Sequence, residues 1–312
     1  MRGLRGLLAA AALGFGMAGG AAAQTTLVIG FPAAGASDII GRIMQPVLAE
    51  ALGTPLVIQN LGGAAGTIGA NAVVRARPDG NTLLLTPAGP VVIQPHFRRD
   101  LPYRVESLAP ICQVADSPVV LMTPANSPFR TLADLIATAR ARPGEVPFAS
   151  TGAGTIPHIV MVALAQQAGV SLNHVPFRGS GDVMLAFQQN QIQLFADQTP
   201  LIRQYGLHPI ASFTEQKLAD FPDLPTARAA GHDIVYSIWS GLYAPAGTPE
   251  PVLARLEAAC LRTMQTPQVV EGFARVNQPI RLRDRAAFTA FTQAESAKFR
   301  ALVESSGLRA AE

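Results

Sequence analysis

The feature that most constrains this chain is a strand, a loop of small residues and a helix start within residues 27–40. Residues 27–29 form a β-branched apolar run that is typical of a buried strand. Pro32 ends the run, and Ser37 or Asp38 can cap the amphipathic helix that follows. Unpaired N–H groups and the helix dipole favour an anion at such a helix start. The stretch therefore predicts an α/β fold with a candidate anion-binding turn.

Short apolar runs alternate with helix-periodic segments in two series, and this alternation predicts parallel strands with crossover helices in each series. Between the series, 111–114 and 119–123 are predicted as strands that are partly antiparallel. The expected strands are 27–31, 56–58, 82–85, 146–149, 173–176, 192–196 and 210–213, and the expected helices are 39–52, 131–141, 157–168, 182–189, 249–264 and 286–305.

The two series predict two lobes with a ligand cleft between them. We expect residues 24–123 and 242–312 to form lobe 1, and residues 124–241 to form lobe 2. The segment 236–244 should carry the chain back to lobe 1. No linker rich in Ser, Gly or Pro separates the series, so short crossing strands should join the lobes and allow hinge closure.

Residues 1–23 have the pattern of a signal peptide. Arg2 and Arg5 make a positive start, the apolar core of residues 7–17 is too short to span a bilayer, and small residues at 21–23 offer a cleavage site. An uncleaved anchor is the alternative interpretation. We expect cleavage before Gln24 and export to the periplasm.

Charge and cysteine content narrow the choice of partners. The chain has 24 basic and 21 acidic residues, and loss of Arg2 and Arg5 with the signal peptide leaves a net charge of about +1. This balance, with no basic run interleaved with aromatic residues, argues against nucleic acid. Cys112 and Cys260 are the only cysteines. They can form one disulfide in an exported protein or remain two buried thiols, and they make no metal site by themselves.

The motifs of common enzymes are incomplete. Residues 35–39 begin like the G-x-S-x-G turn of hydrolases but end in Ile39, and 179–181 has the wrong spacing. Ser37 is therefore expected to act as a helix cap rather than as a nucleophile. The histidines are scattered, without a pair spaced for a metal ion. We expect no catalytic residue, no metal and no cofactor.

The glycine-rich segment 62–69 invites comparison with a nucleotide-binding loop. Its glycines do not fit G-x-G-x-x-G, and no Walker A lysine exists because Lys217 and Lys298 are the only lysines. Tight turns and close packing of helix on sheet explain these glycines better.

Two loops can face each other across the cleft. Loops 31–38 and 150–155 are small and polar, and each opens a helix. Together they can hold the two ends of a short dicarboxylate through backbone N–H groups and hydroxyls. We call them the lobe 1 loop and the lobe 2 loop.

Several single residues near these loops have both a functional and a structural interpretation. Arg178 follows a strand and can supply a cation, although a lone arginine is usually solvated. Asp197 ends another strand and can accept from a ligand ammonium or orient a loop. Asp38 fits a structural cap better than a ligand contact, since its charge would repel an anion. His158 can contact ligand or pack locally, and Trp239 fits core packing between the lobes.

The chain resembles the periplasmic solute-binding receptors of tripartite tricarboxylate transporters, known as Bug receptors. The resemblance covers essentially the whole mature chain, and its specificity comes from the order and spacing of motifs that are individually weak. These motifs are Phe31-Pro32 with Gly35 and Ser37-Asp38, residues 60–69, residues 78–84, Val175-Pro176-Phe177-Arg178-Gly179, Leu224-Pro225-Thr226, Ala230-Gly231, and residues 241–249.

The resemblance implies a two-lobed, monomeric periplasmic binding protein of the type II kind, which captures a small carboxylate or amino acid and performs no reaction. Its partners would be this ligand and inner-membrane transporter subunits. The implied ligand contacts are Phe31, Ala34, Gly35, Ser37, Asp38, Thr86 and Ala88 in lobe 1, and Ser150, Thr151, Gly154, Thr155, His158 and Asp197 in lobe 2.

The sequence departs from the family pattern in its loops. Residues 33–36 contain fewer glycines than usual, Leu61-Gly62 replaces Arg-Pro, and Ala65 replaces a glycine. Alanine disfavours backbone conformations with positive φ, so we expect altered loop shapes. An exported hydrolase that uses Ser37, and an adaptor that presents its ligand to a sensor kinase, are the alternative functions.

Overall fold

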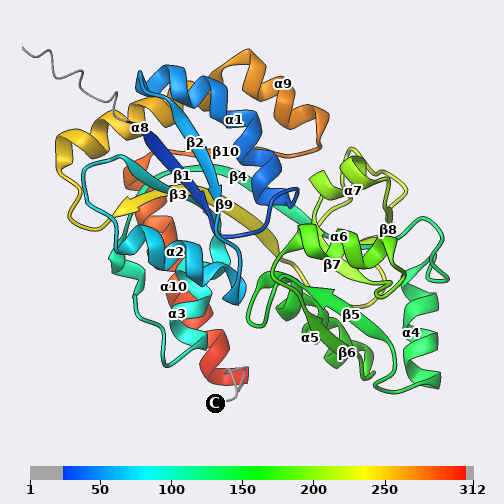
Figure 1. Cartoon of the computed structure of the whole chain (residues 1–312). Helices are drawn as coiled ribbons and strands as arrows, with labels where there is room; N and C mark the ends of the chain where they lie inside the picture. Colours follow the sequence, from blue (N-terminus) through cyan, green and yellow to red (C-terminus); the bar gives the residue numbers. More distant parts are fainter. Residues whose placement is uncertain (1–23, 307–312) are drawn as a thin grey trace, which may run out of the picture.

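The computed structural model describes residues 24–306, so the signal peptide expected at 1–23 lies outside the described residues. These residues form two α/β lobes that share a 10-stranded mixed sheet (Figure 1). The main path runs β2-β1-β3-β9-β4-β7-β5-β6, and β8 and β10 both pair with β4. The strands are β1 (Thr25–Ile29), β2 (Leu56–Asn60), β3 (Thr82–Pro87), β4 (Leu108–Thr123), β5 (Pro147–Ser150), β6 (Asn173–Pro176), β7 (Phe195–Gln198), β8 (His208–Ser212), β9 (Ser237–Pro245) and β10 (Ile280–Arg283).

The long strand β4 belongs to both lobes. Its first part pairs antiparallel with β9 from Leu108 to Pro118, and its second part pairs with β7 and β8. The two strands expected at 111–114 and 119–123 are therefore one continuous strand. β9 returns the chain to lobe 1, where it pairs with β3. The boundary residues that we assigned to the lobes stay a prediction, but β4 and β9 are the crossing segments that join them.

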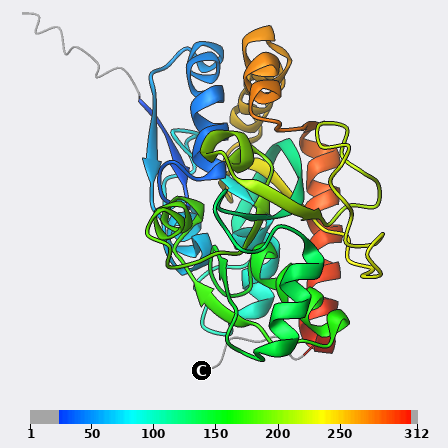
Figure 2. The ribbon, with the colours of Figure 1, turned by 90° about the vertical axis from the view of Figure 1, so that its right-hand side faces the viewer.

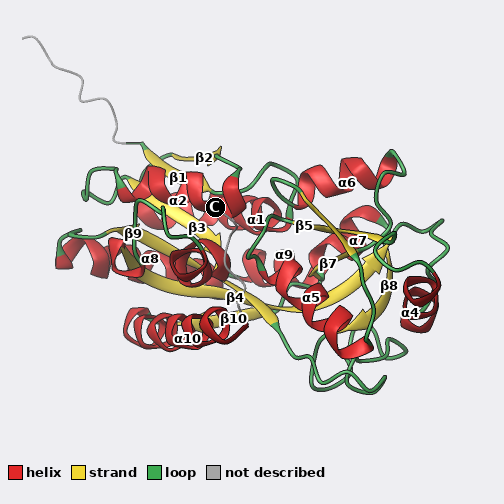
Figure 3. Ribbon diagram, turned by 90° about the horizontal axis from the view of Figure 1, so that it is seen from below, coloured by secondary structure: helices red, strands yellow, loops and turns green. Residues whose placement is uncertain are grey.

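Helices cover both faces of the sheet in each lobe. In lobe 1, α1, α8 and α9 pack on one face and α2 and α10 on the other, and α10 runs down one side of the molecule (Figures 2 and 3). The helices are α1 (Ala36–Leu52), α2 (Thr67–Val74), α3 (Gln94–Phe97), α4 (Leu132–Ala141), α5 (Ile156–Ala168), α6 (Ser180–Gln188), α7 (Pro200–Tyr205), α8 (Glu250–Gln265), α9 (Pro267–Arg275) and α10 (Arg285–Ser306).

Strand alternation builds the core. Leu27 and Ile29 of β1 face α1, and Val28 between them faces α2. Each side chain of this size contributes roughly 2 kcal/mol when it is fully buried. Trp239 of β9 is also buried, as expected, and packs edge-on against Phe288 of α10. The crossing strands are thus anchored in the core.

Cys112 of β4 and Cys260 of α8 form a disulfide, with Cα atoms 6.6 Å apart. The bond joins positions 148 residues apart and links the start of the crossing strand to a helix near the chain's end. Because it closes so long a loop, it restricts the unfolded chain strongly.

Two differences from the expected elements concern the site. The strand expected at 192–196 is displaced, since β7 spans Phe195–Gln198 and contains Asp197 rather than ending before it. Helices α1, α5 and α6 begin one to three residues earlier than expected. Ser37 and Ser180 favour turns and caps on propensity alone, and Ile156 stands before a proline, so the pattern did not show these starts.

Candidate functional site

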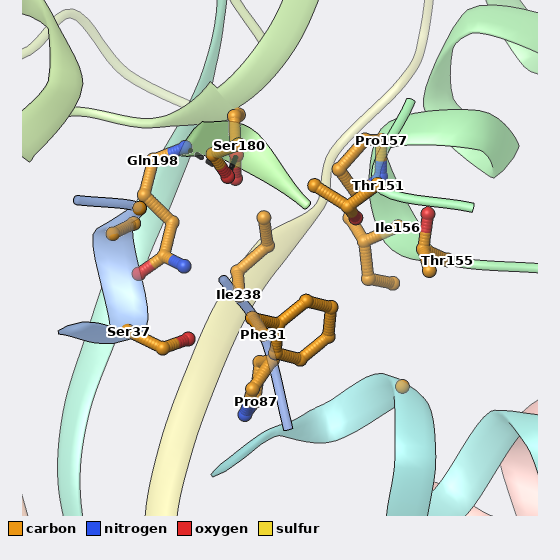
Figure 4. A pocket seen from close by; sticks show the side chains of 14 residues that line it. Phe31, Ser37, Pro87, Thr151, Thr155, Ile156, Pro157, Ser180, Gln198 and Ile238 are labelled. Atoms are coloured by element: carbon orange, nitrogen blue, oxygen red, sulfur yellow. Dashed lines mark hydrogen bonds between the residues drawn. The ribbon is translucent and has the colours of Figure 1, made fainter. Parts of the chain in front are cut away.

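A pocket of about 440 Å³, part of it open to solvent, lies between the lobes at the crossing strands (Figure 4). Among the described residues that line it, Asp197 is the only one with an ionisable side chain. The lining residues are Phe31, Gly35, Ala36, Ser37, Pro87 and Gly89 from lobe 1, Thr151, Thr155, Ile156, Pro157, Ser180, Asp197 and Gln198 from lobe 2, and Ile238 from β9.

The lobe 1 wall is the start of α1. Gly35 occupies the N-cap position and no side chain caps the helix, so the expectation that Ser37 does so is wrong. The first hydrogen bonds of the helix run from the backbone N–H groups of Asp38 and Ile39 to the Gly35 carbonyl. The N–H groups of the first helical residues have no acceptor within a helix. They are therefore available to an acceptor in the pocket.

Asp38 holds the lobe 1 loop from behind. Its buried carboxylate accepts hydrogen bonds from the Ala34 N–H (2.9 Å), Arg42 Nε (2.8 Å) and Asn60 Nδ2 (3.1 Å). These three hydrogen bonds compensate the negative charge of the carboxylate. Asp38 is absent from the pocket lining. The expectation that Asp38 caps the helix is therefore wrong, because it accepts from Ala34 before the helix and not from the first helical N–H groups.

The lobe 2 wall is the loop before α5. Ser150 Oγ accepts from the Gly152 N–H at 3.1 Å, and Thr155 Oγ1 donates to the Gly152 carbonyl at 2.7 Å. Gly152 and Gly154 have φ angles of 121° and 72°, which favour glycine. Side-chain hydroxyls thus shape this loop, where a carboxylate shapes the other.

Two stacked histidines support the lobe 2 loop. His158 Nδ1 accepts from the Gly154 N–H at 3.2 Å, and His174 Nε2 lies 2.6 Å from Ser150 Oγ. Their ring centroids are 4.0 Å apart. Burial lowers the pKa of both, and burial together with the neighbouring His158 lowers that of His174 to about 4. His158 therefore holds the loop as a neutral acceptor and is absent from the pocket lining.

Asp197 lies at the lobe 2 side of the pocket, 2% exposed. Ser180 Oγ donates to its Oδ2 at 2.5 Å and the Gln198 N–H donates to its Oδ1 at 2.9 Å. Burial raises the pKa of Asp197 to about 6, although both hydrogen bonds oppose the rise. A titratable carboxyl therefore faces a pocket that has no lining cation among the described residues.

The lobes touch on both sides of the pocket. Tyr205 Oη of α7 donates to the Ala34 carbonyl at 2.5 Å, and Gln94 Nε2 of α3 donates to the Ala153 carbonyl at 2.9 Å. Glycines permit a close approach, because a Cβ on Gly152 would lie 3.0 Å from that of Ala65. The pocket is thus enclosed by contacts between the lobes.

The structure places six of the residues named from the resemblance in the pocket lining and the others beside it. Phe31, Gly35, Ser37, Thr151, Thr155 and Asp197 line the pocket, whereas Ala34, Asp38, Thr86, Ala88, Ser150, Gly154 and His158 lie outside the lining, in the adjoining loops, strands and helices. Arg178 pairs instead with Asp182 of α6 on the surface. Whether each residue contacts ligand stays a prediction.

Sequence reasoning missed the start of α6 and the end of β7. Ser180 and Gln198 line the pocket from these elements, and Ile238 lines it from β9. The segment Arg178-Gly179-Ser180 did offer a signal, since it follows a strand and opens a helix as the two named loops do. Nothing local marked Gln198 or Ile238.

Two further classes of site find no support. The structure shows no cluster of three or more His, Cys, Asp or Glu side chains that could hold a metal ion within residues 24–306. In the same part of the chain, no helix is long and apolar enough to cross a membrane.

Comparison with known proteins agrees with this geometry. Residues 40–308 match the family described as the tripartite tricarboxylate transporter family receptor, TctC. BugT of Bordetella pertussis is 32% identical over 255 residues, which cover 80% of this chain and 78% of BugT.

Two solved structures share the fold closely. The periplasmic binding protein BugD superposes with a TM-score of 0.86 at 26% identity, over 92% of this chain and 98% of BugD. MatC from Rhodopseudomonas palustris, solved with bound malate, gives a TM-score of 0.83 at 27% identity, over 90% of this chain and 98% of MatC. The chain belongs to the TctC family of tripartite tricarboxylate transporter receptors.

Proposed function

We propose that this protein is a periplasmic solute-binding receptor that captures a small carboxylate between its lobes and delivers it to a tripartite tricarboxylate-type transporter. One observation carries the proposal. The starts of α1, α5 and α6 all reach the same pocket, through Ala36 and Ser37, Ile156, and Ser180. A helix start offers unpaired N–H donors and the positive end of a dipole.

The composition of the pocket supports a ligand of low charge. The hydroxyls of Ser37 and Thr151 line it together with the apolar side chains of Phe31 and Ile238, whereas the hydroxyl of Thr155 donates to the Gly152 carbonyl. Without a lining cation among the described residues, the charge of a carboxylate would be met by backbone N–H groups and hydroxyls. Such donors suit a small carboxylate with a short carbon chain.

The geometry does not support a hydrolase. Ser37 has no hydrogen-bonded histidine or carboxylate within the described part of the chain, and a serine nucleophile needs such a base. His158 already uses Nδ1 to hold Gly154. The members of this family are solute-binding receptors rather than enzymes.

Delivery of the ligand would depend on closure of the two lobes around it. The hydrogen bonds of Tyr205 and Gln94 between the lobes would form when ligand closes the hinge at β4 and β9. Inner-membrane subunits, or a sensor kinase in the alternative role, would then recognise the surface of the closed form. We further propose that the protein acts as a monomer and that its signal peptide is cleaved before Gln24.

A pocket-filling substitution tests the proposal. Gly89 lines the pocket, and a Cβ added there would meet only Thr155 Cγ2, at 4.0 Å. Gly89→Leu should therefore fill the pocket without disturbing the backbone. A thermal-shift screen of three- to six-carbon mono- and dicarboxylates, aromatic acids and acidic amino acids should find ligands that stabilise the wild type.

The expected result is a loss of that stabilisation in Gly89→Leu, with the melting temperature of the empty protein little changed. Ala137→Leu, on the exposed face of α4, adds the same bulk away from the pocket and is the control. No stabilisation of the wild type by any acid, or equal stabilisation of Gly89→Leu, would contradict the proposal.

A further inference from the structure

The side chain of Gln198 links the pocket to the crossing strand β4. It is 3% exposed, and its terminal amide lies between β4 and the pocket (Figure 4). Its Oε1 is 3.0 Å from Ser117 Oγ of β4, and its nitrogen is on the pocket side in Figure 4. Ser117 Oγ also lies 2.7 Å from Oε1 of Gln278. One hydroxyl therefore faces two amide oxygens.

A hydroxyl has a single proton, so Ser117 cannot donate to both oxygens. The partners of Gln278 decide which one receives it. Gln278 Nε2 donates to the Pro279 carbonyl at 3.2 Å, so a half turn of that amide would bring two oxygens together. The Ser117 proton therefore belongs to Gln278, and the Gln198 atom beside Ser117 must be a donor.

A half turn of the Gln198 amide meets this requirement without changing the shape of the side chain. Its NH₂ group then donates to Ser117 Oγ, and its carbonyl oxygen faces the pocket. In the orientation drawn, the bond with Ser117 is the only hydrogen bond that the Gln198 side chain makes within residues 24–306. The proton count thus gives the pocket an acceptor at this position.

Asp197 adds a second acceptor on the same wall. Its carboxylate already receives Ser180 Oγ and the Gln198 N–H, and each oxygen keeps a further lone pair. The α1 side of the pocket offers N–H donors, while this wall offers oxygens. A ligand that satisfies both carries a carboxylate and, close to it, a hydrogen-bond donor.

We propose that Gln198 presents its carbonyl oxygen to the pocket and, with Asp197, selects a carboxylate that carries an α-ammonium group over the matching unsubstituted acid. Ser117 is a positioning residue that fixes the amide orientation. This inference rests on the proposed function and names the ligand class of that site. An α-hydroxyl fits the acceptors too, but only an ammonium meets the charge of Asp197.

Matched ligands test the inference by isothermal titration calorimetry. The pairs are succinate and L-aspartate, glutarate and L-glutamate, and propionate and L-alanine, with L-malate as the hydroxyl member of the four-carbon set. The amino acid of the best-binding pair should bind at least tenfold more tightly than its plain acid, since a hydrogen bond to a charged group is lost with the ammonium.

Variants assign the preference to the proposed residues. Gln198→Met removes the acceptor and Ser117→Ala frees the amide to turn, so both should reduce the ratio of the two dissociation constants roughly tenfold. Gln198→Glu presents only oxygens and should keep the preference. A ratio between two ligands is insensitive to a general loss of stability, because both ligands bind the same folded protein.

Three results would overturn the inference. A plain acid that binds as tightly as its amino acid, or L-malate tighter than L-aspartate, would contradict the ligand class. An amino-acid preference that survives in Gln198→Met would remove Gln198 from the account. If none of the seven ligands binds, the inference fails, and the wider thermal-shift screen decides separately whether the proposed function fails with it.

Discussion

The lobe 1 and lobe 2 loops open helices into the same pocket but are held in different ways. Asp38 holds the lobe 1 loop through one buried charge that receives three donors. The lobe 2 loop is held by neutral groups, namely the hydroxyls of Ser150 and Thr155 and the imidazoles of His158 and His174. One anion-binding geometry can therefore rest on a charge or on a network of neutral groups, with different sensitivity to mutation and pH.

The backbone differs as well. The lobe 1 side of the pocket places alanines at positive φ, with 63° at Ala34 and 58° at Ala65, whereas lobe 2 uses Gly152 and Gly154. The expectation that alanine would change the loop shapes by avoiding such conformations is wrong at these positions. Contacts such as that of Tyr205 with the Ala34 carbonyl hold the conformation despite its cost of about 1 kcal/mol per residue.

Removal of the Asp38 charge should have the largest effect on stability. Asp38→Ala leaves the Ala34 N–H and the Asn60 amide without their acceptor and should lower the free energy of unfolding by about 3 kcal/mol. Ser150→Ala should cost about 1 kcal/mol. Urea unfolding measures both.

Asp182→Ala is the matched control, because Asp182 occupies the same third position of α6 and pairs with Arg178 at the surface. Its effect should be small. Equal losses for Asp38→Ala and Asp182→Ala would show that burial of the charge is irrelevant.

The next largest difference between the two loops should appear when one methyl group is added to a glycine of each. A Cβ on Gly152 would approach Ala65 Cβ at 3.0 Å and require an alanine at φ 121°, so Gly152→Ala should weaken ligand binding about tenfold or more. Gly35→Ala has a φ of −83° and an ordinary nearest contact of 3.4 Å, so its affinity should change little. Titration calorimetry compares the two.

Combination with Ala65→Gly removes the facing methyl group and should restore part of the affinity of Gly152→Ala. Equal affinities of Gly35→Ala and Gly152→Ala would contradict the packing that we describe between the lobes.

A fall in pH should lower the stability of lobe 2, because its buried histidines are bound to the loop in their neutral form. The pKa of His174 is about 4 in the folded protein, against 6.5 for an unperturbed histidine, so the unfolded chain binds the proton first as the pH falls. The contribution of neutral His174 is present above pH 6.5 and is lost as the pH falls toward 4.

His174→Gln keeps a polar partner for Ser150 but does not titrate, and it should therefore reduce the loss of unfolding free energy between about pH 7.5 and about pH 5. His208→Gln, outside the stack, is the control. Urea titrations at the two pH values measure the loss, and an unchanged pH dependence in His174→Gln would exclude His174 as its source.

The smallest expected effect comes from relief of backbone strain. Ala34→Gly should raise the free energy of unfolding by up to about 1 kcal/mol, because glycine adopts φ 63° without strain. Ala33→Gly, at a neighbouring position without positive φ, should lower it. Thermal unfolding distinguishes them, and a melting temperature that falls in both variants would argue against strain at Ala34.

Much of the fold followed from local patterns. The alternating apolar runs predicted the two lobes and their crossing segments, because strand and helix periods are properties of short segments. A helix was expected at 131–141, and Thr131 does stand at its start, where its side chain accepts from the Asp134 N–H as the N-cap of α4. α7 and α9 were not predicted, although each begins with a proline, Pro200 or Pro267, which suits a first helical turn.

The candidate site was less predictable than the fold. The lobe 1 and lobe 2 loops carried helix-start signals, but Gln198 and Ile238 reach the pocket only through the pairing of β4 with β7 and β9. The roles of Asp38 and His158 also depended on contacts with Asn60 and His174, which are distant from them in the sequence. Pairwise geometry of this kind has no signature in a single local sequence pattern.

The most direct test of the central claim is a crystal structure with the tightest-binding carboxylate from the thermal-shift screen. We predict that the carboxylate lies between the lobes, with its oxygens about 3 Å from the backbone N–H groups at the start of α1 and from the hydroxyl of Thr151. A ligand bound outside this pocket, or one whose carboxylate points away from all three helix starts, would contradict the account.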